Sequence, residues 1–374
     1  MGNARPVVLV DVKNCVLHGA GITHWLETLF AELKTGQSLI DFVFVAPNVA
    51  NPKNISFGSR EIVKLSWLNR MPGVVQNLVY DNFTFPRFAR KIKPALVFSP
   101  YFDLRIPRGT RSIITIHDLC YLKLPNIYPQ LTRKYFVHAM KRSINRAEFV
   151  VTVSNSVARE IAEMFLSTVG RIQTFGNSIP DEFRNYTPSD SEILAFRDGF
   201  GAAGTQLILY TGGLERRKNI DTLFRALVLV HQAGIPFNLV ITGERNSLWN
   251  KYLTRYPNIS ESIAFTGRLR LPDLKVAYAA SDKVVYPSLC EGFGRVVGES
   301  MFVGTPIVCS DLDVFREVAG KYPHYFDPSS VTELAELLGQ SPLPPHDIDI
   351  KAPNLTDAEI SHNFLRFIEE VVGK

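Results

Sequence analysis

Short apolar runs recur along the chain and alternate with segments whose apolar residues follow a helical period. Most of the runs are continuous rather than alternating, as in strands that are covered on both faces. Their alternation with helices predicts the α/β class, with parallel, doubly wound sheets. The predicted strands are residues 7–12, 42–46, 61–65, 95–100, 112–118 and 149–154 in the first half, and 206–213, 238–244, 263–267, 283–288 and 306–310 in the second.

A boundary between two domains is predicted where Pro, Asp, Ser and Asn residues accumulate, in residues 178–204. The chain is 374 residues long and 46% hydrophobic, which is enough to build two cores. We therefore expect an N-terminal domain of residues 1–180 and a C-terminal domain of residues 181–355. A helical pattern from Thr356 to Val372 closes the chain.

Positive charge is concentrated in the first half. The whole chain has a net charge of +5, but residues 1–180 hold 22 Lys and Arg against 11 Asp and Glu, which gives +11 there and leaves −6 for the remainder. A cationic half suits a nucleic acid, an anionic membrane surface or an anionic substrate, and scattered solubilising charge is the simpler alternative. The basic amphipathic helix predicted at 131–146, with the basic run at 87–93, is the best candidate for a membrane-facing surface, against an ordinary solvated helix face.

The cysteines indicate neither a zinc site nor a disulfide framework. The four of them are far apart and form no C-x-x-C motif, a pattern that fits a reducing cytosol. We expect no bound metal ion. Residues 1–12 hold one arginine and a short apolar run, which is too short for a signal peptide or a spanning helix, and no membrane span is predicted elsewhere.

The stretch Tyr286–Ser300, YPSLCEGFGRVVGES, places two carboxylates eight positions apart. An apolar strand enters it, Gly292 and Gly294 allow a steep turn, and a helical period then resumes, so the pattern predicts strand, tight loop and helix. Ligands bind in open α/β sheets at such loops, and one ligand could contact both Glu291 and Glu299. The alternative is one acid that complements the helix dipole and a second acid on a solvated face.

Three cations, Arg216, Arg217 and Lys218, follow the predicted strand at 206–213 and stand at a helix start. Cations at that end of a helix oppose its dipole, so local helix stability does not require them. A diphosphate bound by these side chains and nearby amides would explain their position. An exposed basic loop is the alternative.

Two further features follow strands of the first half. Gly19 and Gly21 begin a helix with an apolar stripe, a geometry that can cradle phosphate, although a plain turn explains it as well. No G-x-G-x-x-G with a downstream acid is present, which disfavours a dehydrogenase. His117 and Asp118 end the strand predicted at 112–118, where ligands bind in such sheets, and a simple turn pair is the alternative.

Six motifs, taken in this order, resemble family 4 of the retaining glycosyltransferases. They are GAGITHW, IHDLCYLKLP, VSNS, YTGGLERRKNI, the stretch from FTGRLRLPDLK to GRVVGESM, and GTPIVCSD. The resemblance implies the GT-B fold, in which two Rossmann-like β/α/β domains with parallel sheets face each other across a deep cleft, and implies that residues 356–374 pack back on the first domain. The implied reaction is transfer of a hexose from a nucleotide diphosphate sugar with retention at the anomeric carbon, without a metal ion or another cofactor.

Matched motif by motif, the resemblance assigns Arg217 and Lys218 to the donor diphosphate, where their charge replaces that of a metal as the leaving group departs. The backbone amide of Gly21 is implied at the same phosphates. His117 matches a histidine beside the transferred sugar, and Asp118 is implied to steady that loop. His117 and Asp118 are thus implied to belong to the catalytic residues.

The stretch around the two glutamates is implied to recognise the donor. Glu291, the third implied catalytic residue, matches a glutamate near the donor sugar, and Glu299 matches one that holds the ribose hydroxyls. We favour a front-face route, in which the leaving phosphate takes the proton of the acceptor, over a double displacement with a carboxylate nucleophile such as Glu291. The remaining implied contacts are made by Gly292, Phe293 and Gly294 for the sugar and by Gly267, Arg268 and Leu269 for the base.

Two positions depart from the family pattern. Gly213 is followed by Leu214, where many members have an arginine, so the diphosphate clamp rests on Arg217 and Lys218. The sequence GRVVGE stands where relatives often have G-L-P-P-L-E, which introduces Arg295 with an unknown partner and leaves the choice of sugar open.

The sequence thus predicts a hexosyltransferase that uses a UDP- or GDP-hexose and a saccharide acceptor, lipid-linked, in surface or extracellular polysaccharide synthesis. We expect a cytoplasmic protein with peripheral contact to the anionic inner face of the membrane through its basic first domain, and no nucleic-acid partner. A GT-B-like sugar-nucleotide epimerase, a phosphorylase and a non-catalytic nucleotide-sugar-binding partner are the alternatives.

Overall fold

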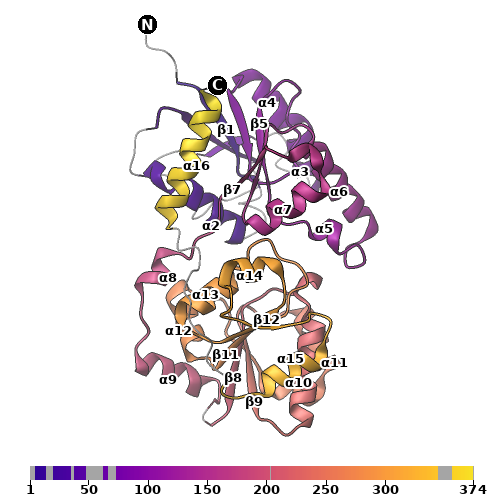
Figure 1. Cartoon of the computed structure of the whole chain (residues 1–374), viewed down its shortest axis with the longest axis vertical. Helices are drawn as coiled ribbons and strands as arrows, with labels where there is room; N and C mark the ends of the chain where they lie inside the picture. Colours follow the sequence, from indigo (N-terminus) through magenta and orange to yellow (C-terminus); the bar gives the residue numbers. More distant parts are fainter. Residues whose placement is uncertain are drawn as a thin grey trace. The chain divides into compact units, whose positions relative to one another are not determined.

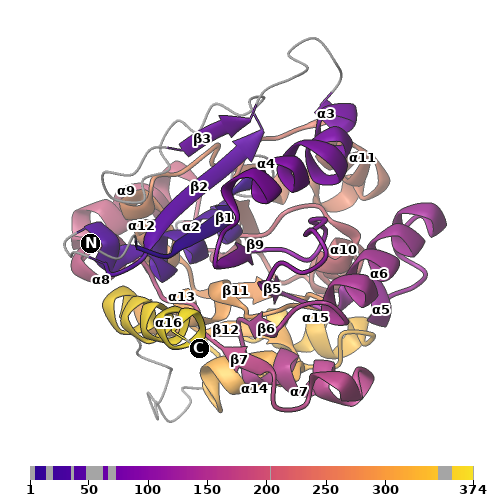
Figure 2. The same cartoon turned by 90° about the horizontal axis from the view of Figure 1, so that it is seen from above.

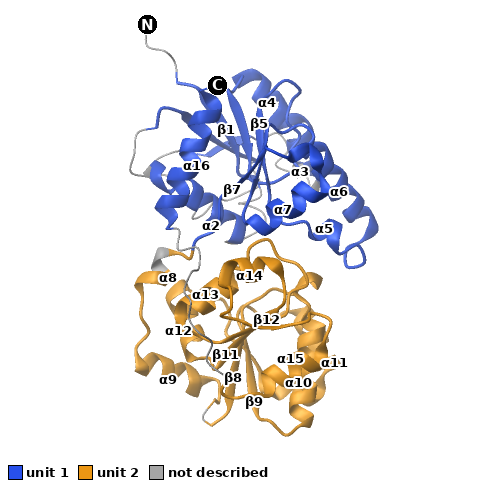
Figure 3. Cartoon of the chain, viewed as in Figure 1, with its two compact units in different colours: residues 1–178, 355–374 blue, residues 179–354 orange. Residues whose placement is uncertain are grey.

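The computed structural model describes residues 5–13, 20–34, 38–47, 62–65, 73–202, 204–343 and 356–373. The chain divides into two compact units (Figure 3), an N-terminal unit of residues 1–178 and 355–374 and a C-terminal unit of residues 179–354. Each unit is built on one parallel sheet with crossover helices. The prediction of an α/β protein with two Rossmann-like domains is therefore confirmed.

The N-terminal unit contains a seven-stranded sheet in the order β3-β2-β1-β4-β5-β6-β7, in which every neighbouring pair is parallel. Its strands are β1 (Val7–Asp11), β2 (Asp41–Pro47), β3 (Ile62–Leu65), β4 (Leu96–Ser99), β5 (Ser112–Ile116), β6 (Phe149–Thr152) and β7 (Ile172–Thr174). Each predicted strand of the first half is present, although residue 61 lies outside the described residues.

Helices connect and cover these strands (Figures 1 and 2). They are α2 (Ala20–Leu29), η1 (Ala31–Lys34), α3 (Gly73–Val79), the π-helical η2 (Tyr80–Thr84), α4 (Phe85–Ile92), α5 (Cys120–Lys123), α6 (Gln130–Ile144), α7 (Asn155–Met164), η3 (Leu166–Thr168) and α16 (Asp357–Val372). The basic helix predicted at 131–146 corresponds to α6. Gly19, the first glycine of the predicted helix start, lies outside the described residues.

The last helix, α16, packs on α2 within the N-terminal unit. The hydroxyl of Thr28 donates to Asp357 Oδ1 at 2.9 Å, and the hydroxyl of Ser361 donates to the carbonyl oxygen of Leu29 at 3.1 Å. The Phe364 ring, which is fully buried, meets three aromatic rings edge-on or tilted: Phe30 directly after α2, Phe98 of β4 and Phe175 directly after β7. Polar bonds at one end of α16 and aromatic packing along it therefore make it part of this core.

The C-terminal unit contains a six-stranded parallel sheet in the order β10-β9-β8-β11-β12-β13. Its strands are β8 (Gln206–Tyr210), β9 (Phe237–Ile241), β10 (Ile263–Phe265), β11 (Lys283–Tyr286), β12 (Ile307–Ser310) and β13 (His324–Phe326). Its helices are α8 (Asp181–Asn185), α9 (Asp190–Gly199), η4 (Arg216–Lys218), α10 (Ile220–Gln232), α11 (Ser247–Arg255), η5 (Pro257–Ser262), α12 (Leu271–Ala280), α13 (Arg295–Val303), α14 (Asp313–Ala319) and α15 (Val331–Gly339).

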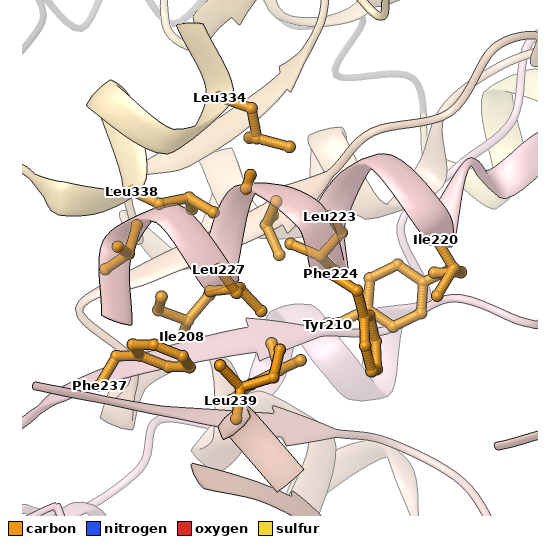
Figure 4. Close-up of a cluster of buried hydrophobic side chains, with 14 of the residues drawn as sticks. Ile208, Tyr210, Ile220, Leu223, Phe224, Leu227, Phe237, Leu239, Leu334 and Leu338 are labelled. Atoms are coloured by element: carbon orange, nitrogen blue, oxygen red, sulfur yellow. The ribbon is translucent and has the colours of Figure 1, made fainter. Parts of the chain in front are cut away.

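Both faces of this sheet are buried, which explains why its strands are continuous apolar runs. Successive residues of a strand point to opposite faces. On β8, Ile208 and Tyr210 belong to a core cluster with α10 and α15 (Figure 4), whereas Leu207 and Leu209 belong to a second cluster with α12, α13 and α14. All four side chains are fully buried. The sheet is therefore a rigid layer whose loops project from its edges.

Candidate active site

Two neighbouring strands of the C-terminal sheet, β8 and β11, are far apart in the sequence. Lys283 pairs with Ile208 in parallel, and the later strands β12 and β13 continue the sheet on one side while β9 and β10 continue it on the other. The winding of the chain therefore reverses between β8 and β11. In open α/β sheets, ligands bind at this reversal, outside the carboxyl ends of the strands. The loops that follow Tyr210 and Tyr286 emerge at that edge.

The loop after β8 folds tightly against its own strand. The Tyr210 hydroxyl donates to the carbonyl oxygen of Gly213 at 2.7 Å. A Cβ atom at Gly212 would lie 2.2 Å from the Tyr210 hydroxyl oxygen, and one at Gly213 would lie 2.4 Å from a carboxylate oxygen of Glu215. A side chain at Gly212 would have to displace the buried Tyr210 ring, whereas the exposed Glu215 side chain could turn away from one at Gly213. The chain then forms η4, and Asn219 in the left-handed region, with a φ of 58°, leads into α10.

Glu291, in the loop after β11, is held by both cations of the loop after β8. Lys218 Nζ lies 2.6 Å from Glu291 Oε1, and Arg217 Nη1 lies 2.9 Å from Oε2. The hydroxyls of Ser288 and Tyr286 donate to Oε1 at 2.8 and 3.0 Å. Both oxygens of the carboxylate are thus engaged, and the side chain is only 9% exposed. The structure brings together three residues that the sequence analysis had placed in two separate motifs.

The environment keeps this carboxylate ionised. Burial alone would raise the pKa of Glu291, but Lys218 and then Arg217 outweigh burial and lower the pKa to about 2. Because the folded-state pKa is lowered, the ion pair stabilises the fold above the ordinary pKa of Glu, and this stabilisation is lost as pH falls toward 2. Two cations surround one carboxylate, so the cluster retains one positive charge. It can therefore attract an anionic ligand.

Glu299 has partners of its own. It lies in α13, 6% exposed, where the Tyr278 hydroxyl donates to Oε2 at 2.8 Å and Arg295 Nη2 donates to Oε1 at 3.2 Å. The unknown partner of Arg295 is therefore Glu299. Arg295 Nε is buried without a hydrogen-bond partner among the described residues. Glu291 and Glu299 share one loop and helix but form two separate polar clusters.

Gly294 turns the loop of Glu291 into α13. Its φ of 90° is left-handed, and a Cβ atom there would lie 2.6 Å from the ring of Phe315. Upstream, the backbone N–H of Leu289 donates to the carbonyl oxygen of Arg217 at 2.7 Å and joins the two loops. The three residues predicted to bind the sugar through their amides thus lie between this junction and the helix, in the order Gly292, Phe293, Gly294.

The residues predicted to seat the base lie at the same sheet edge but outside the Glu291 cluster. Gly267 follows β10, which is two strands away from β8. Its carbonyl oxygen accepts from the N–H of Gly243 at 2.9 Å, and its φ of 70° requires a glycine. Arg268 is exposed, and Leu269 is half-buried against the core of this unit.

The other predicted site residues lie in the N-terminal unit. His117 follows β5, and its Nε2 donates to the carbonyl oxygen of Pro100 at 2.9 Å. Burial lowers the pKa of His117, so the ring is neutral at pH 7 and its Nδ1 is an acceptor. Asp118 Oδ1 accepts a hydrogen bond of 3.0 Å from the backbone N–H of Cys120, the first residue of α5. Gly21 is exposed in the first turn of α2.

Three side chains of the C-terminal site were missing from the sequence analysis. Tyr286 and Ser288 bond to Glu291, and Tyr278 bonds to Glu299. Tyr286 lies near the carboxyl end of the strand predicted at 283–288 and is the last residue of β11, so its position at the ligand-binding edge could be predicted from the sequence. Its hydrogen bond to Glu291 could not be predicted, because a tyrosine in an apolar strand can equally well pack in the hydrophobic core.

Two features are absent from the described ranges. No group of three or more His, Cys, Asp or Glu side chains is arranged there to hold a metal ion. Among the same residues, none of the helices combines the length and the apolar character needed to cross a membrane.

Comparisons with known proteins identify the class to which this fold and site belong. The family model "Glycosyltransferase Family 4" matches residues 38–183, and the model "Glycosyl transferases group 1" matches residues 205–340. The two models cover most of both units. The chain belongs to the group 1, family 4 glycosyltransferases, and the resemblance seen in its motifs is confirmed.

The relatives agree with this family, and solved structures share its fold. The chain is 29% identical over 315 residues to the O-antigen chain mannosyltransferase B of Escherichia coli, with 82% of this chain and 80% of the relative covered. It is 26% identical to the O-antigen chain mannosyltransferase RfbU of Salmonella typhimurium, covering 60% and 58%. Its fold is similar to sucrose-phosphate synthase of Thermosynechococcus elongatus, with a TM-score of 0.70 at 17% identity and coverage of 98% and 96%. It is equally similar to Anabaena HepE in complex with UDP-glucose, with a TM-score of 0.70 at 15% identity and coverage of 98% and 100%. These likenesses confirm the GT-B fold.

Replacing Gly294 by Ala is expected to destabilise the C-terminal unit and displace the Glu291 loop, because the methyl group would strain the left-handed backbone and collide with Phe315. Gly304 is a matched control, since it ends the same helix with a φ of 86° and nothing lies within 4 Å of an added Cβ atom. We expect Gly304→Ala to cost about 1–2 kcal/mol of unfolding free energy from backbone strain alone, and Gly294→Ala to cost about 1–3 kcal/mol more from overpacking. Chemical denaturation measures both; equal losses would contradict the steric account.

Proposed function

We propose that this chain transfers a hexose from a UDP- or GDP-hexose to a hydroxyl of a saccharide acceptor, with retention at the anomeric carbon, in polysaccharide synthesis. The observation that carries the proposal is the cluster of Glu291, Arg217 and Lys218 at the reversal point of the C-terminal sheet. The names of the relatives, which are mannosyltransferases of O-antigen chains, support a hexose and a polysaccharide product. The fold shared with HepE in complex with UDP-glucose supports a nucleotide-sugar donor.

The donor diphosphate would bind to the positive charge that remains in the cluster. Arg217 and Lys218 are fixed by Glu291 before any ligand arrives, so little reorganisation is needed when negative charge develops on the leaving phosphate. Their two cations would supply the stabilisation that a metal ion provides in other enzymes, and no metal ion or other cofactor is needed in this proposal. The amide of Gly21 is the proposed contact from the N-terminal unit.

The proposed mechanism is the front-face route. The two cations that lower the pKa of Glu291 to about 2 also make its carboxylate a weaker base and therefore a weaker nucleophile. Glu291 is therefore better suited to orient Lys218 and the sugar than to form a covalent intermediate. The leaving phosphate would accept the proton of the acceptor hydroxyl. His117, steadied by the Asp118 turn, would accept a hydrogen bond from the transferred sugar at its Nδ1.

The rest of the donor would be recognised along the same sheet edge. The amides of Gly292, Phe293 and Gly294 are the proposed partners of the sugar hydroxyls. Glu299, pre-oriented by Tyr278, is the proposed ribose ligand. The base would lie against Gly267, Arg268 and Leu269, which follow β10.

The acceptor is proposed to be lipid-linked and to meet the N-terminal unit at the cytoplasmic face of the membrane. The charge of +11 in residues 1–180 supports peripheral contact with an anionic leaflet. On α6, Lys134 and Lys141 are exposed cations beside the exposed apolar side chains of Leu131 and Tyr135. Such a mixture of cations and apolar groups suits a membrane interface.

The function is tested by incubating the protein with GDP-mannose, UDP-glucose or UDP-galactose and a lipid-linked saccharide from a polysaccharide pathway. We expect a glycosylated product with one of these donors, and an anomeric NMR signal of the same configuration as the donor. Turnover of the nucleotide sugar without an acceptor would indicate an epimerase instead. Binding without any turnover would indicate a non-catalytic partner, and an inverted product would contradict retention.

Substitution of the two glutamates should separate their roles. Glu291→Ala removes the group that orients Lys218 and the sugar, so it is expected to reduce kcat by about 100-fold or more while nucleoside diphosphate affinity changes little. Glu299→Ala removes a ribose ligand and is expected to weaken nucleotide binding by about tenfold with a smaller effect on kcat. Isothermal titration with UDP and GDP, together with steady-state kinetics, measures both. Equal effects of the two variants on nucleotide binding would contradict this division.

A further inference from the structure

A second candidate site lies in the N-terminal unit, at the amino ends of its strands. The connection between β4 and β5 and the C-terminal end of α6 enclose a cavity of about 170 Å³. Ser112, the first residue of β5, lines it, whereas His117 follows the opposite end of this strand. The cavity is therefore separate from the loops that carry the proposed catalytic residues. Its polar lining consists of Arg108, Arg142, Arg146, Thr110, Ser112 and Ser143.

The three arginines of this cavity form no ion pair with any acid in the described part of the chain. Arg142 is half-buried, and its Nη2 donates to the carbonyl oxygen of Asp103 at 3.3 Å. Arg108 and Arg146 are exposed. Among the residues that the structure describes, no carboxylate oxygen lies within 4.0 Å of any of the three guanidinium groups. Three cations thus line one small cavity, and none of the described carboxylates pairs with them.

Asp103, whose carbonyl oxygen binds Arg142, and Glu148, two residues after Arg146, use their carboxylates elsewhere. The Asp103 carboxylate accepts from Lys13 Nζ at 3.0 Å, in a buried cluster that also contains Asp81. Glu148 receives two hydrogen bonds from Arg111, each at 2.8 Å. Either carboxylate would have to give up these bonds before it could turn toward the cavity. A change of side-chain rotamer at Asp103 or Glu148 therefore does not readily neutralise the three arginines.

No described carboxylate pairs with these cations to offset their mutual repulsion. Burial, followed by the nearby Arg105, lowers the pKa of Arg142, and Arg146 acts in the same direction while Tyr135 and Asp103 oppose it. An anion that binds between such cations offsets their mutual repulsion, so its binding is favourable. Guanidinium groups donate in a planar fork that matches phosphate oxygens, and the hydroxyls of Thr110 and Ser112 lie in the same lining.

We propose that this arginine pocket, defined by Arg108, Arg142 and Arg146, binds a phosphate group of a phosphomonoester or phosphodiester. The pocket is smaller than the roughly 300–1,000 Å³ of sites that enclose whole small molecules, so it suits the phosphate of a larger compound rather than a complete nucleotide. The ligand comes either from a soluble phosphate ester or from the headgroup of an anionic phospholipid. The proposal uses none of the donor-site residues and does not depend on the proposed reaction.

The test compares two double variants of the N-terminal unit that change the net charge equally. Arg142→Gln with Arg146→Gln removes two cations of the pocket, whereas Lys64→Gln with Arg159→Gln, the control variant, removes two exposed cations that lie outside the pocket and outside α6. The probes are glycerol 3-phosphate, titrated by calorimetry, and vesicles of phosphatidylglycerol or of phosphatidylcholine in a flotation assay. Because hydrogen bonds to charged groups are strong, we expect the arginine variant to lose about tenfold or more in affinity and the control variant to lose about twofold or less.

The outcomes separate the sources of the ligand. Binding of glycerol 3-phosphate that is lost in the arginine variant supports a soluble phosphate ester, and loss confined to phosphatidylglycerol vesicles supports a lipid headgroup. Equal losses in both variants would mean that only the overall charge matters, and would overturn the pocket. Absence of binding of either probe to the wild-type protein would also overturn it.

Two controls keep the result interpretable. UDP and GDP affinity is measured in every variant, because Arg217 and Lys218 are unchanged and the donor site should be unaffected. If the arginine double variant melts at a lower temperature, Arg108→Gln replaces it, since this exposed side chain contributes to the pocket without being part of the core. That single variant should still bind the effective probe about threefold or more weakly; unchanged binding would overturn the role of Arg108.

Discussion

The buried ion pair between Glu291 and the two cations Lys218 and Arg217 is the interaction on which the C-terminal site depends. It joins the loops of β8 and β11, strands that are adjacent in the sheet and more than 70 residues apart in the chain. Burying these charges is costly, and removing one partner of such a pair typically costs about 3–5 kcal/mol. The cost is offset by four polar partners of the carboxylate, three at Oε1 and one at Oε2. Because two cations pair with one carboxylate, one positive charge is not neutralised, and it is available to attract a diphosphate.

Tight backbone turns place this ion pair, and they explain the glycines around it. Gly212 and Gly213 allow the loop after β8 to fold onto Tyr210 and Glu215, and Gly294 passes Phe315 before α13 begins. The helix then carries Glu299 to a second cluster. β11, the loop after it and α13 therefore position two carboxylates, Glu291 and Glu299, in different surroundings. Their separate partners explain why the two residues do not behave as an acid and base pair.

The sequence was informative about the fold because most strands are buried on both faces and read as continuous apolar runs. β7 and β13 are absent from the predicted strands; each has three residues, most of them half-buried, and leaves a weak pattern. Motif resemblance found Glu291 and Lys218 but not their mutual bond, because a contact across 73 positions depends on strand order. Tyr278 was missed for a similar reason, since an apolar helix conceals a hydroxyl that reaches Glu299. Arg295 stands out in the sequence as a departure from the family pattern. Its partner, Glu299, could be identified only from the structure of α13.

The most direct test of the account is a thermal-shift measurement with GDP, UDP, dTDP, their sugars and the corresponding nucleosides. A ligand that binds only the native state stabilises it in proportion to the logarithm of its excess, by about 2.7 kcal/mol at 100 times its Kd. The account predicts a clear rise in Tm with at least one nucleoside diphosphate, and a much smaller rise with the matching nucleoside at equal concentration, because the surplus charge beside Glu291 acts on the phosphates. No shift with any nucleoside diphosphate, or equal shifts with the nucleoside, would contradict it.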